Sequence, residues 1–241
     1  MNKRKLTALV MCEYSDVVSK ALRKKGFITI SNDLLPSENP HGWHVQGDCF
    51  EVLSNIKELF SITNNKKIDL IIMHPPCTAL AVSGNATYAK GKPKYAERLA
   101  AIKWTTDLFK AAKAAANYVC MENPVGILPF KPAQYIQPWE FGHTEKKKTG
   151  LWLFNLPKLR ATNNVYDEMI KLPKKEQEKT WYMSPSPTRG HERSRTYQGI
   201  ADAMADQFGG FIQTVINTNN ILKREQRVTS THSCSHFRGI M

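Results

Sequence analysis

The sequence predicts an α/β protein built on one doubly wound, mostly parallel sheet. Helical and strand-like patterns alternate along most of its 241 residues, a length that suits one substantial core. Several apolar runs end abruptly at polar segments, as buried parallel strands do at the edge of a sheet. In the clearest run, IDLIIMHPPCT at Ile68 to Thr78, the apolar residues stop at His74-Pro75-Pro76-Cys77. Ligands of open α/β sheets bind at that edge, so this loop is the first candidate for a functional site.

The N-terminal part of the chain predicts alternating strands and helices. Each strand is a short apolar run, and each helix has a capping residue before it or a glycine just after it. The expected elements are a strand at Leu6 to Cys12, a helix at Asp16 to Lys25 capped by Ser15, a strand at Phe27 to Asn32 and a helix at Cys49 to Phe60.

The rest of the chain continues the alternation before it becomes polar. We expect a mobile loop at Thr78 to Tyr95, a helix at Ala96 to Ala116, strands at Tyr118 to Met121, Pro138 to Phe141 and Gly150 to Phe154, and a helix at Ile200 to Asn217. Residues 1–217 are then one domain. Residues 218–241 are aperiodic, and we expect a disordered tail that carries Cys234 and His236 without function.

The charge and the cysteines restrict the partners and the location of the chain. It has 34 Lys and Arg residues against 21 Asp and Glu, a formal net charge of +13, which favours nucleic acid over an acidic protein as partner. The five cysteines are widely spaced and form no CxxC pair, so they indicate neither a disulfide framework nor a zinc site. No apolar stretch suits a signal peptide or a membrane span. We therefore expect a cytoplasmic monomer without metal or membrane.

Two successive strands end in residues that can carry chemistry. One delivers Cys77, whose thiolate is a strong nucleophile, and the next ends in Glu122-Asn123-Pro124. Loops after neighbouring parallel strands open at the same edge, so the thiol and the carboxyl are expected to face one pocket. The alternatives are a buried apolar Cys77 and a solvated Glu122. Their convergence at one edge favours a joint role in chemistry.

Two acidic residues are candidates for binding a nucleotide. Asp33 follows the second strand, where nucleotide-binding α/β sheets hold a ribose hydroxyl. An ordinary turn residue is the alternative for Asp33, and a helix cap is the alternative for Asp48.

Residues 155–195 form an irregular basic region with Trp181 and Tyr182 among its lysines and arginines. Basic residues interleaved with aromatic ones suit phosphate contacts and base stacking, although a solvated basic surface has the same composition. The basic residues are Lys158, Arg160, Lys171, Lys174, Lys175, Lys179, Arg189, Arg193 and Arg195.

The order of these motifs resembles the DNA cytosine 5-methyltransferase family, in the small form found in phage genomes. Ser31-Asn32-Asp33 resembles the end of that family's second strand, and Gly47-Asp48 resembles its Gly-Asp motif. Pro76-Cys77 resembles its Pro-Cys nucleophile, and Glu122-Asn123 its Glu-Asn pair. The likeness extends to about Phe208.

Three segments depart from the family pattern. Glu13-Tyr14-Ser15 replaces a Phe-x-Gly turn after the first strand. Glu145, Lys147 and Thr149 stand where the family has Gln, Arg and Arg. Residues 155–195 form a compressed version of the family's target-recognition region.

The resemblance implies a fold of the S-adenosylmethionine-dependent methyltransferase type, S-adenosylmethionine as cofactor, DNA as partner, and the host cytoplasm as location if a phage encodes the chain. The cofactor contacts that it implies are Glu13, Tyr14, Asp33, Asp48, Cys49 and Pro76, and the catalytic residues are Cys77, Glu122, Asn123 and Lys147.

The chemistry of cytosine explains these residue types. Carbon 5 is a poor nucleophile, but addition of a Cys77 thiolate to carbon 6 turns the ring into an enamine that accepts a methyl group at carbon 5. Glu122 would protonate or hydrogen-bond ring nitrogen 3. Asn123 would orient Glu122 and bind the exocyclic amine, and Lys147 would support a base oxygen or a phosphate. A base within a duplex would first have to flip out.

Two other functions fit the same residues. One is cysteine-dependent alkylation of a pyrimidine in RNA or in a free nucleotide, since the recognition region is small. The other is a basic DNA-binding protein of the same fold without activity, because the glycine turn is absent. Methylation of an exocyclic amine fits less well, because His74 precedes the prolines and Cys77 follows them.

Overall fold

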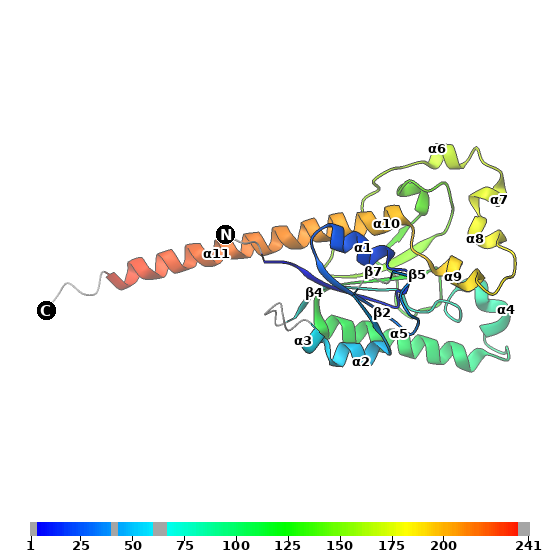
Figure 1. Ribbon diagram of the computed structural model, residues 1–241, viewed down its shortest axis with the longest axis horizontal. Helices are drawn as coiled ribbons and strands as arrows, with labels where there is room; N and C mark the ends of the chain where they lie inside the picture. The colour runs from blue at the N-terminus through cyan, green and yellow to red at the C-terminus, as the bar shows by residue number, and fades with distance from the viewer. Residues whose placement is uncertain (1–3, 40–42, 60–66, 236–241) are drawn as a thin grey trace.

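The computed structural model describes residues 4–39, 43–59 and 67–235, and its centre is a seven-stranded sheet (Figure 1). The strand order is β3-β2-β1-β4-β5-β7-β6. The strands are β1 (Thr7–Met11), β2 (Ile28–Asp33), β3 (His44–Gln46), β4 (Ile68–Met73), β5 (Ala116–Pro124), β6 (Gln134–Ile136) and β7 (Thr149–Phe154).

The sheet confirms the predicted fold class. Strands β1 to β5 pair in parallel, whereas β7 is antiparallel to both of its neighbours, β5 and β6. This order, with β7 reversed, is that of the S-adenosylmethionine-dependent methyltransferase fold. The central strands β1 and β4 are buried along their whole length, which explains their nearly unbroken apolar sequences.

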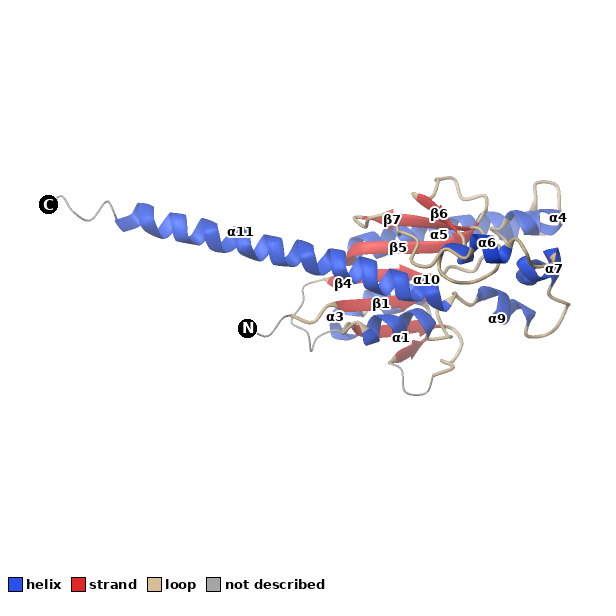
Figure 2. Ribbon diagram, turned by 90° about the horizontal axis from the view of Figure 1, so that it is seen from above, coloured by secondary structure: helices blue, strands red, loops and turns tan. Residues whose placement is uncertain are grey.

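Helices cover both faces of the sheet, as Figures 1 and 2 show. On one face, α1 (Val17–Lys24), α10 (Gln198–Ala203), the π-helical turn η4 (Met204–Phe208) and the start of α11 (Gly209–Ser235) share a core that includes Leu22, Val10 and Phe208. On the other face, α2 (Cys49–Ser54) and α5 (Tyr95–Ala115) pack on Leu9, Ile71 and Val119. The helix α3 (Ile56–Leu59) follows α2.

The register of the parallel strands aligns the residues that leave the sheet at its carboxyl edge. Met11 lies opposite Asn32 and Met73, and Met73 lies opposite Met121. The next residue of each strand therefore starts a second row, which consists of Cys12, Asp33, His74 and Glu122. Asp33 and Glu122 are still paired with β3 and β7, and both lie at this carboxyl edge.

Three local predictions are wrong. Pro138 to Phe141 is not a strand: Pro138–Glu140 is the 3₁₀ turn η3, because a proline cannot donate to a ladder and because Gln137 and Glu140 form a capping box. The strand of this region is β6. Ser15 does not cap α1, whose N-cap residue is Asp16. The loop after Cys77 contains η2 (Val82–Gly84) and α4 (Asn85–Tyr88) and is held by hydrogen bonds from α5.

The last helix continues past the predicted end at Asn217, and residues 218–235 are helical. This stretch contains neither Gly nor Pro and includes good helix formers such as Leu222, Lys223 and Glu225, so nothing local stops the helix. It extends away from the sheet (Figures 1 and 2). His236 and the rest of residues 236–241 lie outside the described residues, as do Phe60 and most of the polar linker before β4.

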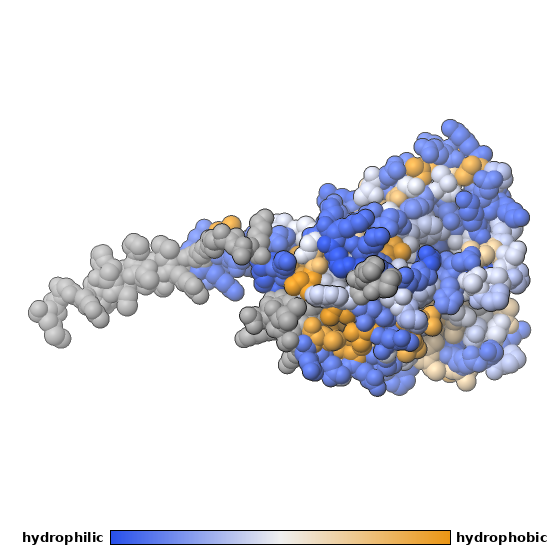
Figure 3. Space-filling view, viewed as in Figure 1, coloured by the Kyte–Doolittle hydropathy of each residue, from blue (hydrophilic) through white to orange (hydrophobic). Residues whose placement is uncertain are grey.

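The basic region 155–195 is less irregular than predicted. It contains the short helices α6 (Tyr166–Met169), α7 (Lys174–Gln177), α8 (Lys179–Tyr182) and α9 (Arg189–Ser194). The face of these helices in Figure 3 is mainly hydrophilic. Among the described residues, no helix combines the length and the apolar character that a membrane span requires.

Candidate active site

The loop that carries Cys77 is attached to strand β5. The side-chain amide nitrogen of Asn123 donates a hydrogen bond to the carbonyl oxygen of Pro75 at 2.8 Å, and both residues are buried. Pro75 and Pro76 restrict the backbone between this anchor and Cys77. Asn123 therefore positions the cysteine loop, whereas the sequence predicted that it would orient Glu122 and bind the base.

Glu122 forms a partly buried pair with His74. Their atoms Oε2 and Nδ1 are 2.9 Å apart, and the side chains are 16% and 8% exposed. Burial alone would raise the pKa of Glu122, but the hydrogen bond and charge of His74, helped by Lys147 and Thr149, lower it overall. Burial would lower the pKa of His74, but the hydrogen bond and charge of Glu122 and the charge of Glu13 raise it. The pair therefore favours a protonated His74 beside an ionised Glu122.

Cys77 is half-buried at the same edge and feels charges of both signs. Burial and the negative charge of Glu122 raise the pKa of its thiol, while the charges of Lys147 and Arg193 oppose this effect. The influence of Glu122 on the thiol is consistent with the predicted convergence of the two groups. In the free protein the net shift keeps Cys77 mainly as a thiol at neutral pH.

Arg98 of α5 holds the segment after Cys77 through hydrogen bonds. This arginine is 5% exposed, and its Nε donates to the carbonyl oxygen of Ala79 at 2.7 Å, while Nη1 donates to Oδ1 of Asn85 at 2.8 Å. The amides of Leu80 and Ala81 also bind the carbonyl oxygen of Cys77 itself. These contacts attach the segment directly after the cysteine to α5 and to the Cys77 backbone.

Lys147 links the sheet edge to the basic region. Its ammonium group donates to the carbonyl oxygens of Arg193 at 2.7 Å and Arg195 at 3.4 Å. It also lies 5.4 Å from the centre of the Tyr197 ring. The charge of Lys147 reaches His74, Glu122 and Cys77, but its hydrogen bonds are made to backbone rather than directed toward a ligand.

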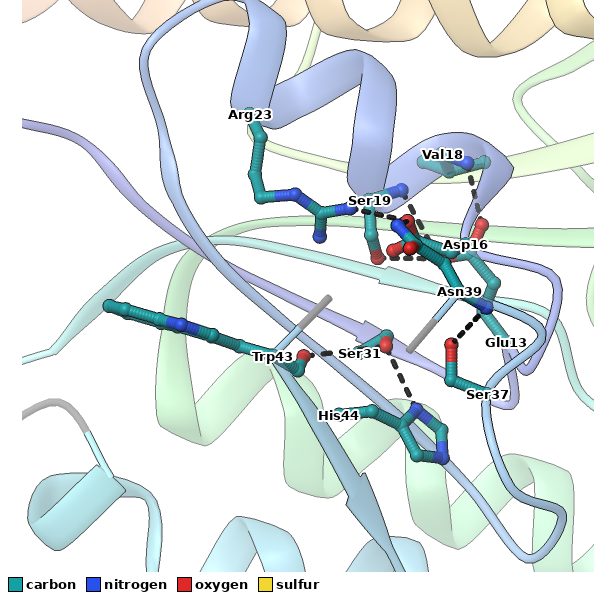
Figure 4. A network of polar contacts seen from close by, with 10 residues as sticks. All are labelled: Glu13, Asp16, Val18, Ser19, Arg23, Ser31, Ser37, Asn39, Trp43 and His44. Carbon is teal, nitrogen blue, oxygen red and sulfur yellow. Dashed lines mark hydrogen bonds and ion pairs between the residues drawn. The ribbon is translucent and has the colours of Figure 1, made fainter. Parts of the chain in front are cut away.

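The turn between β1 and α1 is built around Glu13 (Figure 4). Its carboxylate accepts hydrogen bonds from the amides of Val18 at 2.6 Å and Ser19 at 3.1 Å, and from the Ser19 hydroxyl at 2.5 Å. Glu13 is 4% exposed, and burial raises its pKa despite these bonds. It thus occupies the N-terminal amides of α1 itself, although the family resemblance assigned it to the cofactor.

The same turn keeps a glycine-like backbone without glycine. Cys12 has φ 58° and Asp16 has φ 60°, values in the left-handed region that cost a non-glycine residue about 1 kcal/mol or more. Interactions of Asp16 offset this cost, because its carboxylate pairs with Arg23 and accepts from Nδ2 of Asn39 at 2.6 Å. Glu13 and Asp16 together stabilise a turn in which the family has glycine.

Helix α9 lies against the same turn. The hydroxyl of Tyr14 donates to the carbonyl oxygen of His191 at 3.0 Å, and the Tyr14 and His191 rings meet edge to face at 5.0 Å. Arg195, just after α9, pairs with Glu38. The basic region therefore borders both the predicted cofactor turn, through Tyr14, and the cysteine side of the edge, through Lys147.

The remaining predicted cofactor residues lie at the ends of β2 and β3 and after β4. Asp33 ends β2, and its Oδ1 accepts from the amide of Leu35 at 2.9 Å. Asp48 is the N-cap of α2, and its Oδ1 accepts hydrogen bonds from the amides of Phe50 and Glu51. It therefore caps this helix, which was the alternative to a cofactor contact. Pro76 is exposed beside Cys77.

Cys49 is buried against Cys12. The two sulfur atoms are 3.5 Å apart, and Cys49 is 6% exposed, so its side chain packs against Cys12 and presents little surface to a ligand.

Among the described residues, no three or more His, Cys, Asp or Glu side chains gather as a metal site would require. A separate hollow of about 480 Å³ lies at the opposite edge of the sheet, beside Asp69, Tyr118 and Ile216.

Comparison with known proteins gives a likeness to solved structures alone. No protein-family model matches the chain, and no curated protein matches its sequence. Among solved structures, the chain is similar to a mutant of DNMT2 from Spodoptera frugiperda, with 14% sequence identity and a TM-score of 0.37. The match covers 67% of this chain and 54% of the DNMT2 chain, so this chain spans about half the length of that protein. At this identity and TM-score, the likeness carries no functional information.

Sequence reasoning missed His74 and Arg98 as parts of the site. His74 stands directly before the two prolines, and its position opposite Glu122 follows once β4 and β5 are paired, so the strand register was the signal. Arg98 gave no such signal, because an arginine in a Lys-rich helix is normally solvated. Only its burial marks it as a structural support of the cysteine loop.

Proposed function

We propose that this chain transfers a methyl group from S-adenosylmethionine to carbon 5 of cytosine in DNA, through a covalent adduct with Cys77. One observation carries the proposal. A cysteine on a proline-restricted loop and a partly buried glutamate lie on adjacent parallel strands at one edge, where Asn123 and His74 connect them. A fold requires no such set for packing, whereas pyrimidine addition chemistry needs both groups together.

The residues at the ends of β1 and β2 fit the nucleoside part of the cofactor. Asp33 uses Oδ1 in its own turn, which leaves Oδ2 as an acceptor suited to ribose hydroxyls. Leu34, 71% exposed, and Leu35 offer apolar surface next to it for an adenine ring. Asp48 offers its second carboxylate oxygen to an amine while Oδ1 caps α2. When bound, S-adenosylmethionine supplies the methyl group as an electrophile.

The amino-acid part of the cofactor would be held differently from the nucleoside part. The amides at the start of α1 are the usual place for an anion, but here Glu13 already binds two of them. A carboxylate ligand would have to use other donors. This feature favours modest cofactor affinity, and it is also the observation that keeps the inactive DNA-binding alternative open to test.

The catalytic residues act on the substrate base. The thiolate of Cys77 bonds to carbon 6, the electrons of the ring shift toward nitrogen 3, and Glu122 donates the hydrogen bond or proton that stabilises them. Pro75 and Asn123 fix the direction of the thiol, and Lys147 and Arg193 favour its ionised form. Loss of the proton at carbon 5 and departure of the sulfur then release the methylated base.

A nucleic-acid substrate is supported by the charge and by the basic region beside the site. Trp181, 59% exposed, and Tyr182 provide rings for stacking, and Arg193 and Arg195 lie next to Lys147 at the sheet edge. Glu145 holds this region in place, since its Oε1 accepts from the amide and the hydroxyl of Thr180. The base would reach Cys77 flipped out or from a single strand.

The test combines transfer and trapping. Full-length protein is incubated with labelled S-adenosylmethionine and DNA, and the labelled base is identified. DNA with 5-fluorocytosine is expected to form a covalent adduct with the wild-type protein and none with Cys77→Ser. Label in RNA or free nucleotide would favour the alkylation alternative, and cofactor binding without transfer to any of them would contradict the proposal. Absence of cofactor binding would favour the inactive DNA-binding protein.

A further inference from the structure

His74 is the least expected member of the site. It follows β4 directly, and the pairing of Met73 with Met121 places it opposite Glu122. Its Nδ1 lies 2.9 Å from Oε2 of Glu122, and its side chain is 8% exposed. Its other ring nitrogen, Nε2, is buried and has no hydrogen-bond partner within residues 4–39, 43–59 and 67–235. A buried ring held by one carboxylate and lacking a second partner is unusual for a purely structural histidine.

The charges around His74 come from four elements. Glu122 faces it from β5, and Glu13 acts on it from the turn before α1. Lys147 opposes them from the segment before β7, and Cys77 lies three residues further along its own loop. Two carboxylates therefore act against one ammonium group, which makes this position favourable for a proton on the imidazole.

This arrangement creates a difficulty for the reaction proposed above. An ionised Glu122 can accept a hydrogen bond but has no proton to give to ring nitrogen 3. The imidazole in contact with it is the nearest described group that can hold such a proton. The proton needed at nitrogen 3 can then come from His74 and reach the base through Glu122.

We propose that His74 is a positioning residue that stores the proton for Glu122 and passes it through that carboxylate to nitrogen 3 of the substrate base. This inference rests on the proposed function. As sulfur of Cys77 bonds to carbon 6, the ring electrons move to nitrogen 3. The Nδ1 proton of His74 moves to the ionised Glu122, and Glu122 passes it on to nitrogen 3. When the ring recovers its original bonding, the proton returns along the same path. The proton lost overall is the one on carbon 5, which passes to water as the bond between carbon 6 and the sulfur of Cys77 breaks.

The pH profile of the reaction distinguishes this role from a structural one. The reactive form combines an ionised Cys77 with a protonated pair. Below the pKa of His74, the rate rises about tenfold per pH unit, because the fraction of Cys77 thiolate increases. Above that pKa, the loss of the proton from His74 cancels this increase, so the rate becomes level and the profile bends. The bend of the wild-type protein is therefore expected at or above the ordinary histidine value of about 6.5.

The activity test uses His74→Asn and His74→Ala. The amide of Asn can still donate to Glu122 near the place of Nδ1 but does not titrate, so a structural role is rescued by Asn and lost in Ala. For proton storage, His74→Asn is expected to react on the order of a hundredfold more slowly in single turnover. Its bend is then set by Glu122 alone, whose pKa rises when the hydrogen bond and charge of His74 are lost, so the bend no longer follows the imidazole titration of the wild-type protein. A wild-type rate and bend in His74→Asn would overturn the proposal.

A second measurement does not depend on activity. In histidine-labelled full-length protein, NMR titration is expected to show one imidazole with a pKa above the ordinary value. Its signal should be absent in His74→Asn, and its pKa should be lower in Glu122→Gln. If no such histidine exists, or if Glu122→Gln leaves it unchanged, proton storage at His74 is wrong. If it behaves as expected but the wild-type protein transfers no methyl group, the proposed function fails instead, and the storage role falls with it.

Discussion

The side-chain amide of Asn123 donates to the carbonyl oxygen of Pro75 at 2.8 Å, so strand β5 holds the loop that presents Cys77. The contact is buried, and it joins residues 48 positions apart in the sequence. The direction of the Cys77 thiol therefore depends on the ends of both β4 and β5. The consequences for activity and stability can be separated by mutation.

Asn123→Ala is expected to slow adduct formation with 5-fluorocytosine DNA by roughly tenfold to a hundredfold, because a loosely held nucleophile loses orientation. It should also reduce the free energy of unfolding by about 1 to 3 kcal/mol, since the carbonyl of Pro75 loses its partner. Adduct rates and denaturant unfolding measure the two effects. Asn117→Ala, at the exposed start of the same strand, is the matched control. Equal adduct rates for the two variants would contradict a positioning role.

Glu122→Gln is expected to slow methyl transfer on the order of a hundredfold, because an amide can hydrogen-bond nitrogen 3 but cannot supply a proton. Cofactor affinity should stay near the wild-type value, since Asp33 and Asp48 remain in place. Single-turnover transfer and calorimetry give the two quantities. A variant as fast as the wild-type protein would remove Glu122 from the chemistry.

The same substitution should make Cys77 more reactive toward iodoacetamide in the absence of DNA. Burial and the charge of Glu122 raise the pKa of the thiol, so alkylation is slow at pH 7 and speeds up as pH increases. Without the Glu122 charge the pKa falls, and more thiolate is present at a fixed pH. Mass spectrometry of the Cys77 peptide measures the rate, with Cys77→Ser as the blank. Slower alkylation in Glu122→Gln would show that the two groups do not interact as described.

Glu13→Ala is expected to reduce the free energy of unfolding by about 1 to 2 kcal/mol, because two amides at the start of α1 lose their cap. Glu13→Gln tests the direction of the pKa shift of Glu13. Burial raises the pKa of Glu13 in the folded state, so its contribution to stability is complete below the unfolded value near 4.3 and is lost as pH rises through the folded value. The stability advantage of the wild-type protein over Glu13→Gln should therefore shrink from pH 4 to pH 7 in urea unfolding. A growing advantage would contradict it.

Arg193→Gln is expected to weaken DNA binding and to lower the slope of log affinity against log salt by about 1, as loss of one phosphate contact does. Lys20→Gln, on the exposed face of α1, keeps the same change in net charge and should leave the slope unchanged. Fluorescence anisotropy over a series of salt concentrations measures both. Identical slopes for the two variants would place the DNA contact elsewhere.

The order of motifs in the sequence was enough to predict the fold class and the position of Cys77 and Glu122 on adjacent strands at one edge. Buried parallel strands are continuous apolar runs, and they end where polar loops begin, so the residues after each run could be assigned to one edge without coordinates. The helix at Ala96 to Ala116 was likewise predicted within one residue of α5. These features depend on local pattern, which a sequence displays directly.

Tertiary structure alone decided what several of these side chains do. Asn123 became the anchor of Pro75, a residue 48 positions away whose carbonyl no local pattern places beside it. Asp48, by contrast, caps α2 through amides two and three residues ahead, which the sequence had offered as its alternative role. His74 met Glu122 only through the register of β4 and β5. The sequence determined which groups reach the edge of the sheet. The packing of strands and helices determined which of them bind each other and which remain to face a ligand, because a hydrogen bond depends on distances that long-range contacts set.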